Sequence, residues 1–226
     1  MPNKPLVVVL LSAGMDSAVC ASIASQSYSL AFLHFQYGQK AGKKELECFK
    51  NLCEFFKPVS IYTKIVELNF FKEIKGSTLL DPQREIPDGE EPGIPSTYVP
   101  FRNAIFLSIA TAWAEVINAQ KIFIGVNQVD FAGYPDCRKE FIDAFNIVID
   151  KGTKPETKIS IEAPILNLSK KEIIQTGIKL GTPFELTWSC YRDADKACGR
   201  CSSCLLRLKG FKELNLKDPI SYEISV

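Results

Sequence analysis

The sequence predicts an α/β fold in three layers, in which helices cover both faces of a mostly parallel five-stranded sheet. Short apolar runs alternate along the 226 residues with segments whose apolar side chains recur at helical spacing. This alternation is typical of parallel strands, because each parallel connection needs a crossover that is usually a helix. Hydrophobic residues make up 46% of the chain and charged residues 23%, which is ordinary for a globular protein.

The expected strands are the apolar runs at residues 6–11, 30–37, 59–68, 121–126 and 159–166. The strand order 3-2-1-4-5 would bring Gly14, Gln39 and Asp130 around one crevice at the carboxyl edge of the sheet, where α/β proteins bind ligands. In the helix that follows residue 102, we expect an inward face made of Ile105, Phe106, Ile109, Ala110, Trp113 and Val116.

Further signals mark helix and loop boundaries. A capping box, Ser169-Lys170-Lys171-Glu172, predicts a helix start, and Gly181 predicts the end of that helix. Residues 76–97 are rich in Gly, Pro and acidic side chains and show no periodicity, so we expect either a mobile loop or a functional lid.

The length fits one large domain or one domain with a small appendage, and we divide the chain into residues 1–186 and a C-terminal segment, 187–226. A net charge of +1 argues against a broad nucleic-acid surface. No apolar run approaches eighteen residues and no export signal is evident, so we expect a cytoplasmic protein without a membrane span. The one histidine, His34, is expected in the core or at a strand end. A single histidine argues against Ser-His-Asp chemistry and against a multi-His metal site.

The turn after the first strand, residues 11–17 (LSAGMDS), is the first candidate site. Backbone N–H groups at a helix start bind phosphate readily, and Ser12 and Ser17 add hydroxyl donors. Asp16 would repel phosphate unless a cation such as Mg²⁺ lies between them. Without a Walker lysine or a dinucleotide glycine pattern, a polar turn with an Asp cap is an equally good reading of this stretch alone.

Four of the eight cysteines, Cys190, Cys198, Cys201 and Cys204, lie within fifteen residues. In a chain without an export signal this clustering indicates a metal site. Four thiolates form a closed structural site, for which zinc fits best and an iron–sulfur cluster is the alternative. We expect the neighbouring Arg207, Lys209 and Lys212 to form a solvated face.

Two other segments carry side chains suited to ligand binding. Arg102 and Asn103 stand at a predicted helix start, where a cation opposes the helix dipole and so suggests a bound anion. Residues 127–138 follow the fourth strand and are rich in hydrogen-bonding side chains.

The motifs together resemble a known family. The turn at 11–17 is similar to the S-G-G-x-D-S signature of the N-type ATP pyrophosphatases, which cleave ATP between the α and β phosphates. Residues 35–39 (FQYGQ), 95–103 (PSTYVPFRN), 125–138 and the cysteine cluster with Thr187-Trp188-Ser189-Cys190-Tyr191 narrow the resemblance to the QueC family. The chain departs from the family at Ala13, where glycine is usual, and at Phe101 and Ala132.

The resemblance implies an ATP-dependent carbon–nitrogen ligase of queuosine biosynthesis. Such an enzyme adenylates 7-carboxy-7-deazaguanine, forms the amide with ammonia and dehydrates it to the nitrile 7-cyano-7-deazaguanine. The implied cofactors and partners are ATP, Mg²⁺, one structural Zn²⁺ held by the four cysteines, and a second copy of the chain in a homodimer.

The resemblance also implies roles for particular residues. Catalysis is assigned to Asp16, Ser17, Arg102 and Lys170. The ATP site is assigned to Leu11, Ser12, Ala13, Gly14, Met15, Asp16, Ser17, Ala18, Val19, Cys20 and Ala21. The substrate site is assigned to Gln39, Arg102, Asn103, Asp130, Phe131, Tyr134, Asp136 and Arg138. Among these, Arg102 and Arg138 are the candidates for the substrate carboxylate, Asp130 and Asp136 for the guanine-like N–H edge, and Tyr134 and Phe131 for stacking.

Three alternatives stay open. A tRNA-modifying sulfurtransferase would share the fold and the adenylation step, but it would need a reactive cysteine and a tRNA surface. A QueC-like enzyme that modifies a protein terminus is poorly separated by sequence. A non-catalytic zinc-ribbon module fits worst, because the loops are dense in ligand-type side chains.

Overall fold

The computed structural model describes residues 4–129, 133–192 and 194–224. Its sheet consists of five parallel strands in the predicted order β3-β2-β1-β4-β5. The strands are β1 (Leu6–Leu10), β2 (Ser29–Gln36), β3 (Ser60–Glu67), β4 (Lys121–Phe123) and β5 (Ser160–Glu162). β1 lies at the centre, and its residues 7–9 are fully buried because helices cover both faces of a parallel sheet.

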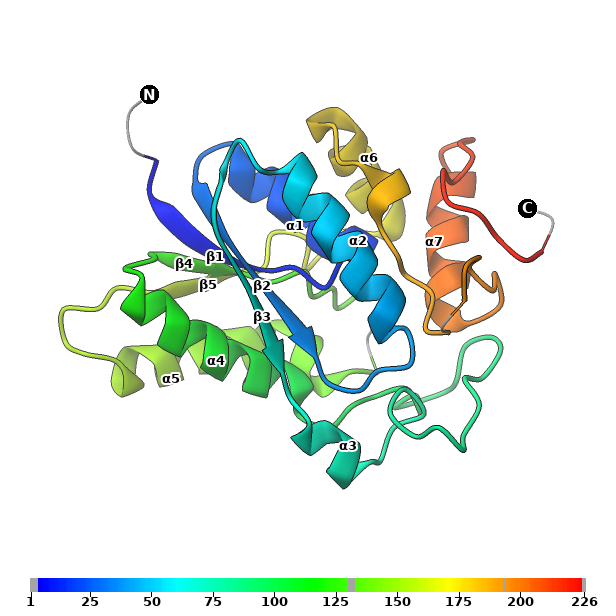
Figure 1. The fold of residues 1–226 in the computed structure, drawn as a ribbon, viewed down its shortest axis with the longest axis horizontal. Coiled ribbons are helices and arrows are strands. Elements are labelled where there is room, and N and C mark those ends of the chain that lie inside the picture. The colour runs from blue at the N-terminus through cyan, green and yellow to red at the C-terminus, as the bar shows by residue number, and fades with distance from the viewer. Residues whose placement is uncertain (1–3, 130–132, 193, 225–226) are drawn as a thin grey trace.

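The helices form the two outer layers (Figure 1). α1 (Met15–Ser25) and α2 (Gly42–Phe55) cover one face, and α4 (Arg102–Val116) and α5 (Lys139–Gly152) cover the other. The chain order reverses between β1 and β4, so right-handed crossovers place the two pairs on opposite faces. The remaining helices are α3 (Phe70–Ile74), α6 (Lys170–Leu180), α7 (Ser202–Lys212) and the 3₁₀ turns η1 (Pro135–Cys137) and η2 (Phe184–Leu186).

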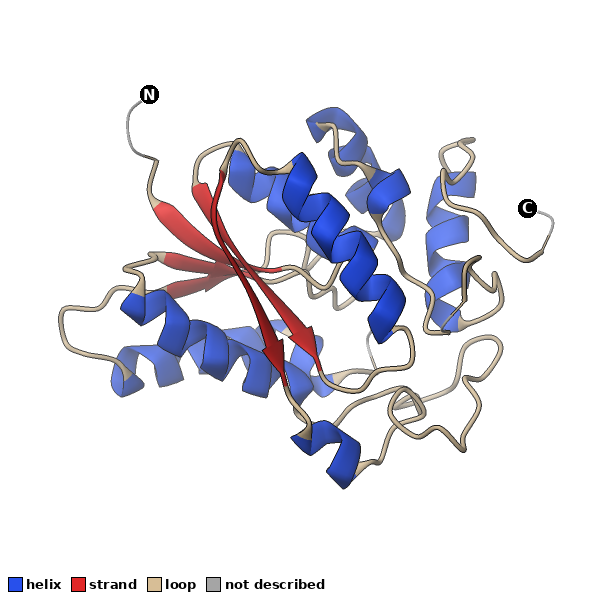
Figure 2. Cartoon of the chain, viewed as in Figure 1, coloured by secondary structure: helices blue, strands red, loops and turns tan. Residues whose placement is uncertain are grey.

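α6 packs against α1 and α7 packs against α6, so the C-terminal segment adjoins the sheet's helical layer (Figure 2). The predicted capping box is confirmed: Ser169 Oγ accepts the Glu172 N–H, and the Glu172 carboxylate accepts the Ser169 N–H. Gly181 ends α6 in the left-handed conformation, at φ 70°. No helix in the described ranges is long and apolar enough to cross a membrane.

The last two strands are shorter than predicted. After β4 the chain runs against the start of α1, where a Cβ on Gly125 would lie 2.9 Å from the Ser17 nitrogen. After β5, the buried Ile165 packs in a cluster with Val19 and Ile173 of the flanking helices rather than in the sheet. Short apolar runs do not distinguish these two kinds of burial.

The predicted inward face of α4 is partly wrong. The fully buried apolar positions are Ala104, Leu107, Ala110 and Ala114, whereas the side chain of Val116 is 78% exposed. Alanines let the helix lie close to β1 and β4, and the larger Ile105, Phe106, Ile109 and Trp113 pack at the edges of the contact, partly buried.

The residues 76–97, expected to be a mobile loop or a lid, are tied to the C-terminal segment. The Gly89 N–H donates to the Arg200 carbonyl at 2.9 Å, and the Arg192 guanidinium contacts the Asp88 carboxylate at 2.6 Å. Because these contacts join two parts of the chain far apart in sequence, the loop covers the region around the cysteine cluster.

The sequence analysis placed Arg207 on a solvated face, and for this residue the prediction is wrong. Its side chain is 1% exposed and forms an ion pair with Asp218, which is 2% exposed. The guanidinium also donates to the Thr187 hydroxyl at 2.7 Å and to the Phe184 carbonyl at 3.1 Å. One buried cation therefore joins α7, the C-terminal tail and the chain after η2. The division at residue 186 stays a prediction.

Replacing Asp218 with alanine is expected to lower the free energy of unfolding by about 3–5 kcal/mol, because the Arg207 charge would stay buried without its partner. Chemical denaturation of the metal-loaded protein measures this change. Glu213→Ala removes an exposed carboxylate at the C-terminal end of α7, the helix that carries Arg207, and is expected to change stability by less than about 0.5 kcal/mol. Equal effects of the two substitutions would contradict a dominant role of the buried pair.

Candidate functional site

A cavity opens at the carboxyl edge of the sheet, where the strand order reverses beside β1. One part of its lining comes from the turn between β1 and α1, with Ser12, Gly14, Met15, Asp16 and Ser17. The other part is an aromatic wall made of Phe35, Tyr37 and Phe106. The Phe35 and Phe106 rings stack with their centroids 4.0 Å apart, and Tyr37 meets Phe106 edge-on at 5.5 Å.

The turn between β1 and α1 is held by its own serines. Ser12 Oγ accepts the Gly14 N–H at 3.2 Å and donates to Ser17 Oγ at 3.1 Å. Ser17 Oγ donates to the Gly14 carbonyl at 2.9 Å. Gly14 is the N-cap of α1 and no side chain caps this helix, so the first N–H groups face the cavity region without a local acceptor.

Ala13 occupies the left-handed region, with φ at 70°. A Cβ makes this conformation unfavourable, and glycine is the residue that adopts it without strain. The Ala13 carbonyl accepts the Trp188 N–H at 2.9 Å, which ties the turn to the chain just before Cys190. The side chain of Ala13 is fully buried, so the strain is borne by a packed residue.

The predicted ATP-binding stretch divides into two groups. Ser12 and the residues from Gly14 to Ser17 line the cavity. The others, Leu11, Ala13, Ala18, Val19, Cys20 and Ala21, are fully buried in the core and do not line it. Burial raises the pKa of the Cys20 thiol well above its usual value, which keeps that thiol neutral.

Lys170 and Asp16 form an ion pair at the start of α1. The Lys170 ammonium lies 2.9 Å and 2.8 Å from the two Asp16 oxygens, and the side chains are 8% and 18% exposed. Lys170 stands in the first turn of α6, so the packing of α6 on α1 brings together two residues 154 positions apart. A cation and a carboxylate thus lie beside the N–H groups of the turn.

Arg102 lies against the aromatic wall. Its guanidinium donates to the Tyr37 hydroxyl at 2.9 Å and sits within 6 Å of the Tyr37 and Phe106 ring centres. Its Nε is buried and has no hydrogen-bond partner among the described residues. The same holds for Trp188 Nε1, and both residues line the cavity. Two unpartnered buried donors at one cavity point to a ligand that offers acceptors.

Asn103 and Asp136 form hydrogen bonds with each other, so these groups are not available to a ligand. The Asp136 carboxylate accepts the Asn103 N–H at 2.9 Å, and the Asn103 amide donates to the Asp136 carbonyl at 3.1 Å. Both side chains are buried, at 6% and 5% exposure. Asp136 therefore satisfies a free N–H at the start of α4, and Asn103, which also lines the cavity, fixes η1 to that helix.

The Gln39 side chain also forms its hydrogen bonds within the protein. Its side-chain oxygen accepts the Tyr37 N–H at 2.8 Å, and its amide donates to the Phe35 carbonyl and to the Glu45 carboxylate. It lines the cavity, but its hydrogen bonds hold the end of β2 and orient Glu45. Sequence reasoning had singled out Gln39 and had missed Glu45, which stands six residues later in the first turn of α2.

The remaining predicted substrate residues are placed differently. Tyr134 lines the cavity, is 8% exposed and has its hydroxyl 2.7 Å from the Thr97 hydroxyl. Arg138 is exposed, contacts Glu140 at 3.6 Å and does not line the cavity. Asp130 and Phe131 lie outside the described residues.

His34 is a core residue, as predicted. It is 1% exposed, stacks on Phe49 and bonds through Nδ1 to the Leu11 carbonyl at 2.9 Å. Burial lowers the pKa of its imidazole, so the ring is neutral at physiological pH. It does not line the cavity.

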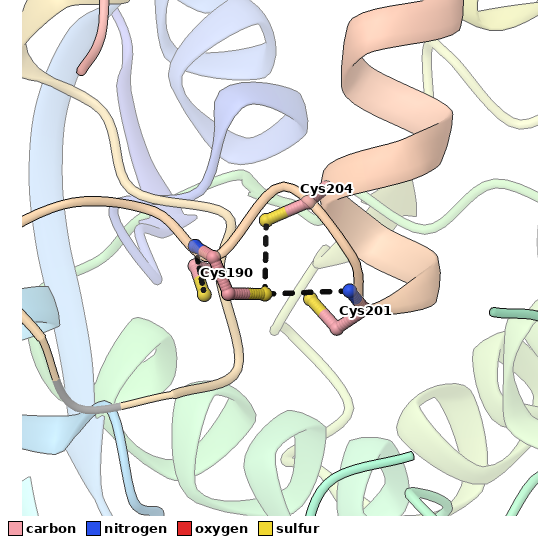
Figure 3. Close-up of side chains that lie close together, drawn as sticks. Cys190, Cys201 and Cys204 are labelled. Carbon is pink, nitrogen blue, oxygen red and sulfur yellow. Dashed lines mark hydrogen bonds between the residues drawn. The ribbon is translucent and has the colours of Figure 1, made fainter. Parts of the chain in front are cut away.

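The four predicted metal ligands do come together. The thiol sulfurs of Cys190, Cys198, Cys201 and Cys204 all lie within 4.8 Å of one another, and all four residues are buried. Figure 3 shows Cys190, Cys201 and Cys204 pointing toward one another, the last two from the start of α7. Backbone N–H groups at 3.3–3.4 Å donate to the sulfurs of Cys190 and Cys198, which fixes the orientation of these two side chains.

This cluster also shapes the cavity. Trp188, Ser189 and Tyr191, which flank Cys190 in sequence, all line it. Gly199 bends the chain between two of the cysteines with φ at 71°, a conformation that glycine adopts freely.

The amino-acid sequence is similar to those of known proteins over nearly its whole length. A 7-cyano-7-deazaguanine synthase of Nautilia profundicola is 48% identical over 218 residues, which cover 96% of this chain and 97% of the relative. A protein of the same name from Chlorobium phaeobacteroides is 49% identical over 220 residues, covering 96% of both.

Solved structures resemble the fold at lower identity. A U34-tRNA thiolase, NcsA, from Methanococcus maripaludis superposes with a TM-score of 0.51 and 15% identity, covering 94% of this chain and 68% of that one. A 4-thiouridine synthetase, solved with RNA and ATP, gives 0.51 and 19%, covering 91% and 50%. The family model described as queuosine biosynthesis protein QueC matches residues 6–215, and the chain belongs to that family.

Proposed function

We propose that this chain is a 7-cyano-7-deazaguanine synthase, which converts 7-carboxy-7-deazaguanine and ammonia to the nitrile at the expense of ATP. The observation that carries the proposal is near-half identity over nearly the full length of curated synthases. The cavity supports it, because an anion-binding turn and an aromatic wall with an arginine open into the same space.

The chemistry requires activation, because a carboxylate is a poor electrophile. Transfer of the adenylyl group from ATP to a carboxylate oxygen releases pyrophosphate and makes that oxygen part of a leaving group. Ammonia then attacks the carbon, loses a proton and expels AMP to leave the amide. A second activation, at the amide oxygen, followed by loss of the N–H protons and the activated oxygen, gives the nitrile. The protein's contribution is positioning and charge stabilisation.

The turn between β1 and α1 would hold the phosphates. Its N–H groups would donate to them, the hydroxyls of Ser12 and Ser17 would turn from their contacts within the turn to do so, and Lys170 adds a positive charge. The Asp16 carboxylate is the ligand type that Mg²⁺ prefers, and each oxygen keeps a free lone pair beside its contact with Lys170. Mg²⁺ there would neutralise phosphate charge as it builds up.

Arg102 is the favoured partner of the substrate carboxylate. It lies on the aromatic wall with a buried Nε that has no partner among the described atoms, and a guanidinium binds a carboxylate through two parallel N–H groups. Arg138 is less suited, since its side chain is exposed and outside the cavity lining.

The four cysteines fit one zinc ion. Tetrahedral zinc with Zn–S bonds of about 2.3 Å requires sulfurs about 3.8 Å apart, and the Cys198 and Cys204 sulfurs lie 3.9 Å apart. An iron–sulfur cluster would hold its thiolates farther apart than the 4.8 Å limit within which these four lie, because several metal atoms stand between them. The zinc is therefore structural, without an open position for substrate.

We further propose that the enzyme works in the cytoplasm as a homodimer on small molecules and without nucleic acid. The net charge of +1 supports the last point. The fold is shared with the tRNA thiolase named above, so a gel shift with tRNA is the discriminating control. The proposed division into residues 1–186 and a zinc-binding segment, 187–226, rests on the cysteine cluster.

Incubation of the purified protein with ATP, Mg²⁺, ammonium and 7-carboxy-7-deazaguanine tests the function. Product mass identifies the nitrile, and nucleotide analysis shows whether AMP or ADP accumulates. Turnover of a protein terminus in place of the free base would instead support the protein-modifying alternative.

Asp16→Asn is expected to fold and to reduce nitrile formation by roughly 100-fold or more, because the carboxylate charge beside the phosphates is lost. Circular dichroism checks the fold, and steady-state rates check the activity. Asp143→Asn, at an exposed position of α5, is expected to retain the wild-type rate. Near-normal nitrile formation by Asp16→Asn would contradict the proposed magnesium role.

Cys201→Ala is expected to lose most of the bound zinc and to lower the melting temperature by roughly 10 °C or more, since metal binding contributes directly to folding. Metal analysis and thermal denaturation measure the two effects. Cys53→Ala removes a thiol in α2, outside the cluster, and is expected to keep the zinc. Full zinc occupancy with unchanged melting would contradict a structural site.

A further inference from the structure

Two carboxylates stand among the described residues that line the cavity, Asp16 and Glu45. Asp16 has the Lys170 ammonium on both of its oxygens. Glu45 has no cation within 4 Å in the part of the chain that the structure describes, and the Gln39 amide donates to its Oε2 at 2.8 Å. The carboxylate of Glu45 thus keeps acceptor capacity that the protein does not use.

Glu45 is held in one orientation by a short series of hydrogen bonds. Gln39 donates to it, and Gln39 itself is fixed by the Tyr37 N–H at 2.8 Å and the Phe35 carbonyl at 3.2 Å. Phe35 lies in β2 and Tyr37 directly follows it, and the side chains of both residues belong to the aromatic wall. The end of β2 therefore both orients the Glu45 carboxylate, through Gln39, and supplies side chains of the aromatic wall.

Glu45 is partly buried, so its carboxylate has lost part of its hydration. Desolvation raises the pKa of the Glu45 carboxyl above its usual value, although the hydrogen bond from Gln39 and the positive charge of Arg102 oppose this effect. A ligand that donates hydrogen bonds to Glu45 would compensate the lost hydration. Arg102 lies on the same wall and supplies the opposite charge.

We propose that Glu45 is the residue that recognises the guanine-type edge of the substrate, accepting hydrogen bonds from the ring N–H and the neighbouring 2-amino group. This inference rests on the proposed function. The substrate carries an anion at one side of a planar ring system and two adjacent donors at another. The wall offers matching groups: aromatic faces for the rings, Arg102 for the anion and Glu45 for the donors.

The sequence analysis had assigned recognition of the guanine-type N–H edge to Asp130 and Asp136. Asp136 is buried and accepts the Asn103 N–H, so its carboxylate caps α4. Asp130 lies outside the described residues. Glu45 is a specificity residue, and Gln39 is the positioning residue that orients it.

The test compares the binding of two ligands by calorimetry, without ATP or ammonium. One is 7-carboxy-7-deazaguanine and the other is its analogue lacking the 2-amino group. The wild type is expected to prefer the first by roughly 10- to 100-fold, because the analogue leaves an acceptor unpaired. In Glu45→Gln this preference is expected to fall below about threefold, since the amide NH₂ opposes one of the donors.

Glu47→Gln, at an exposed position of the same helix, is the matched control and is expected to keep the wild-type preference. In steady-state assays, Glu45→Gln is expected to raise KM for the deazapurine and to leave KM for ATP and ammonium within about threefold. A rise confined to KM for ammonium would overturn the proposal and assign Glu45 to the ammonia step.

The wild-type comparison needs no variant, so the proposal can still be overturned if Glu45→Gln fails to fold. Equal affinity of the wild type for both ligands would overturn the recognition role while nitrile formation still stood. Absence of nitrile formation by the wild type would overturn the proposed function, and the two failures are thereby distinguishable.

Discussion

One backbone hydrogen bond, from the Trp188 N–H to the Ala13 carbonyl, joins the two parts of the chain that enclose the cavity. It can form because Ala13 takes a positive φ, which turns its carbonyl toward the C-terminal segment. The left-handed conformation of an alanine costs about 1–2 kcal/mol, and the surrounding packing must impose it. The packing around the turn is tight: Ala13 is fully buried, and Gly125 leaves no room for a Cβ beside the start of α1. Ala13 thus adopts the turn geometry that glycine would adopt without strain.

The cavity carries two sets of charges, each made of one cation and one carboxylate. At the turn, Asp16 and Lys170 neutralise each other across α1 and α6, so the N–H groups there remain the main attraction for phosphate. At the aromatic wall, Arg102 and Glu45 do not form an ion pair, and each retains hydrogen-bonding capacity. The Asp16–Lys170 ion pair leaves both groups compensated until a nucleotide or Mg²⁺ binds. Arg102 and Glu45, which do not pair, suit recognition of a ligand that has both an anionic group and hydrogen-bond donors.

The sequence predicted the strand order, the capping box, the core histidine and the four thiol ligands, because each depends on local patterns or on spacing within one segment. It failed where a side chain is satisfied by a distant partner. Arg207 looked like part of a basic surface, yet Asp218 and Thr187 bury it. Asp136 looked like a free carboxylate, yet it caps a helix that begins 34 residues earlier. Glu45 was overlooked because nothing local distinguishes it from other glutamates on an amphipathic helix. Its character comes from the hydrogen bond with Gln39 and from partial burial near the end of β2.

The cysteine cluster has a second consequence beyond anchoring the tail. Cys190 stands between Trp188 and Tyr191, and these two residues line the cavity. A metal ion fixes its ligands to within a few tenths of an ångström, so it also restrains the chain on either side of each ligand. The same segment receives the Arg200 and Arg192 contacts from the loop at residues 76–97. Because Trp188, Tyr191 and the covering loop are all joined to the segment that carries the cysteines, an ion bound there would set the position of one side of the cavity without contacting the reacting atoms.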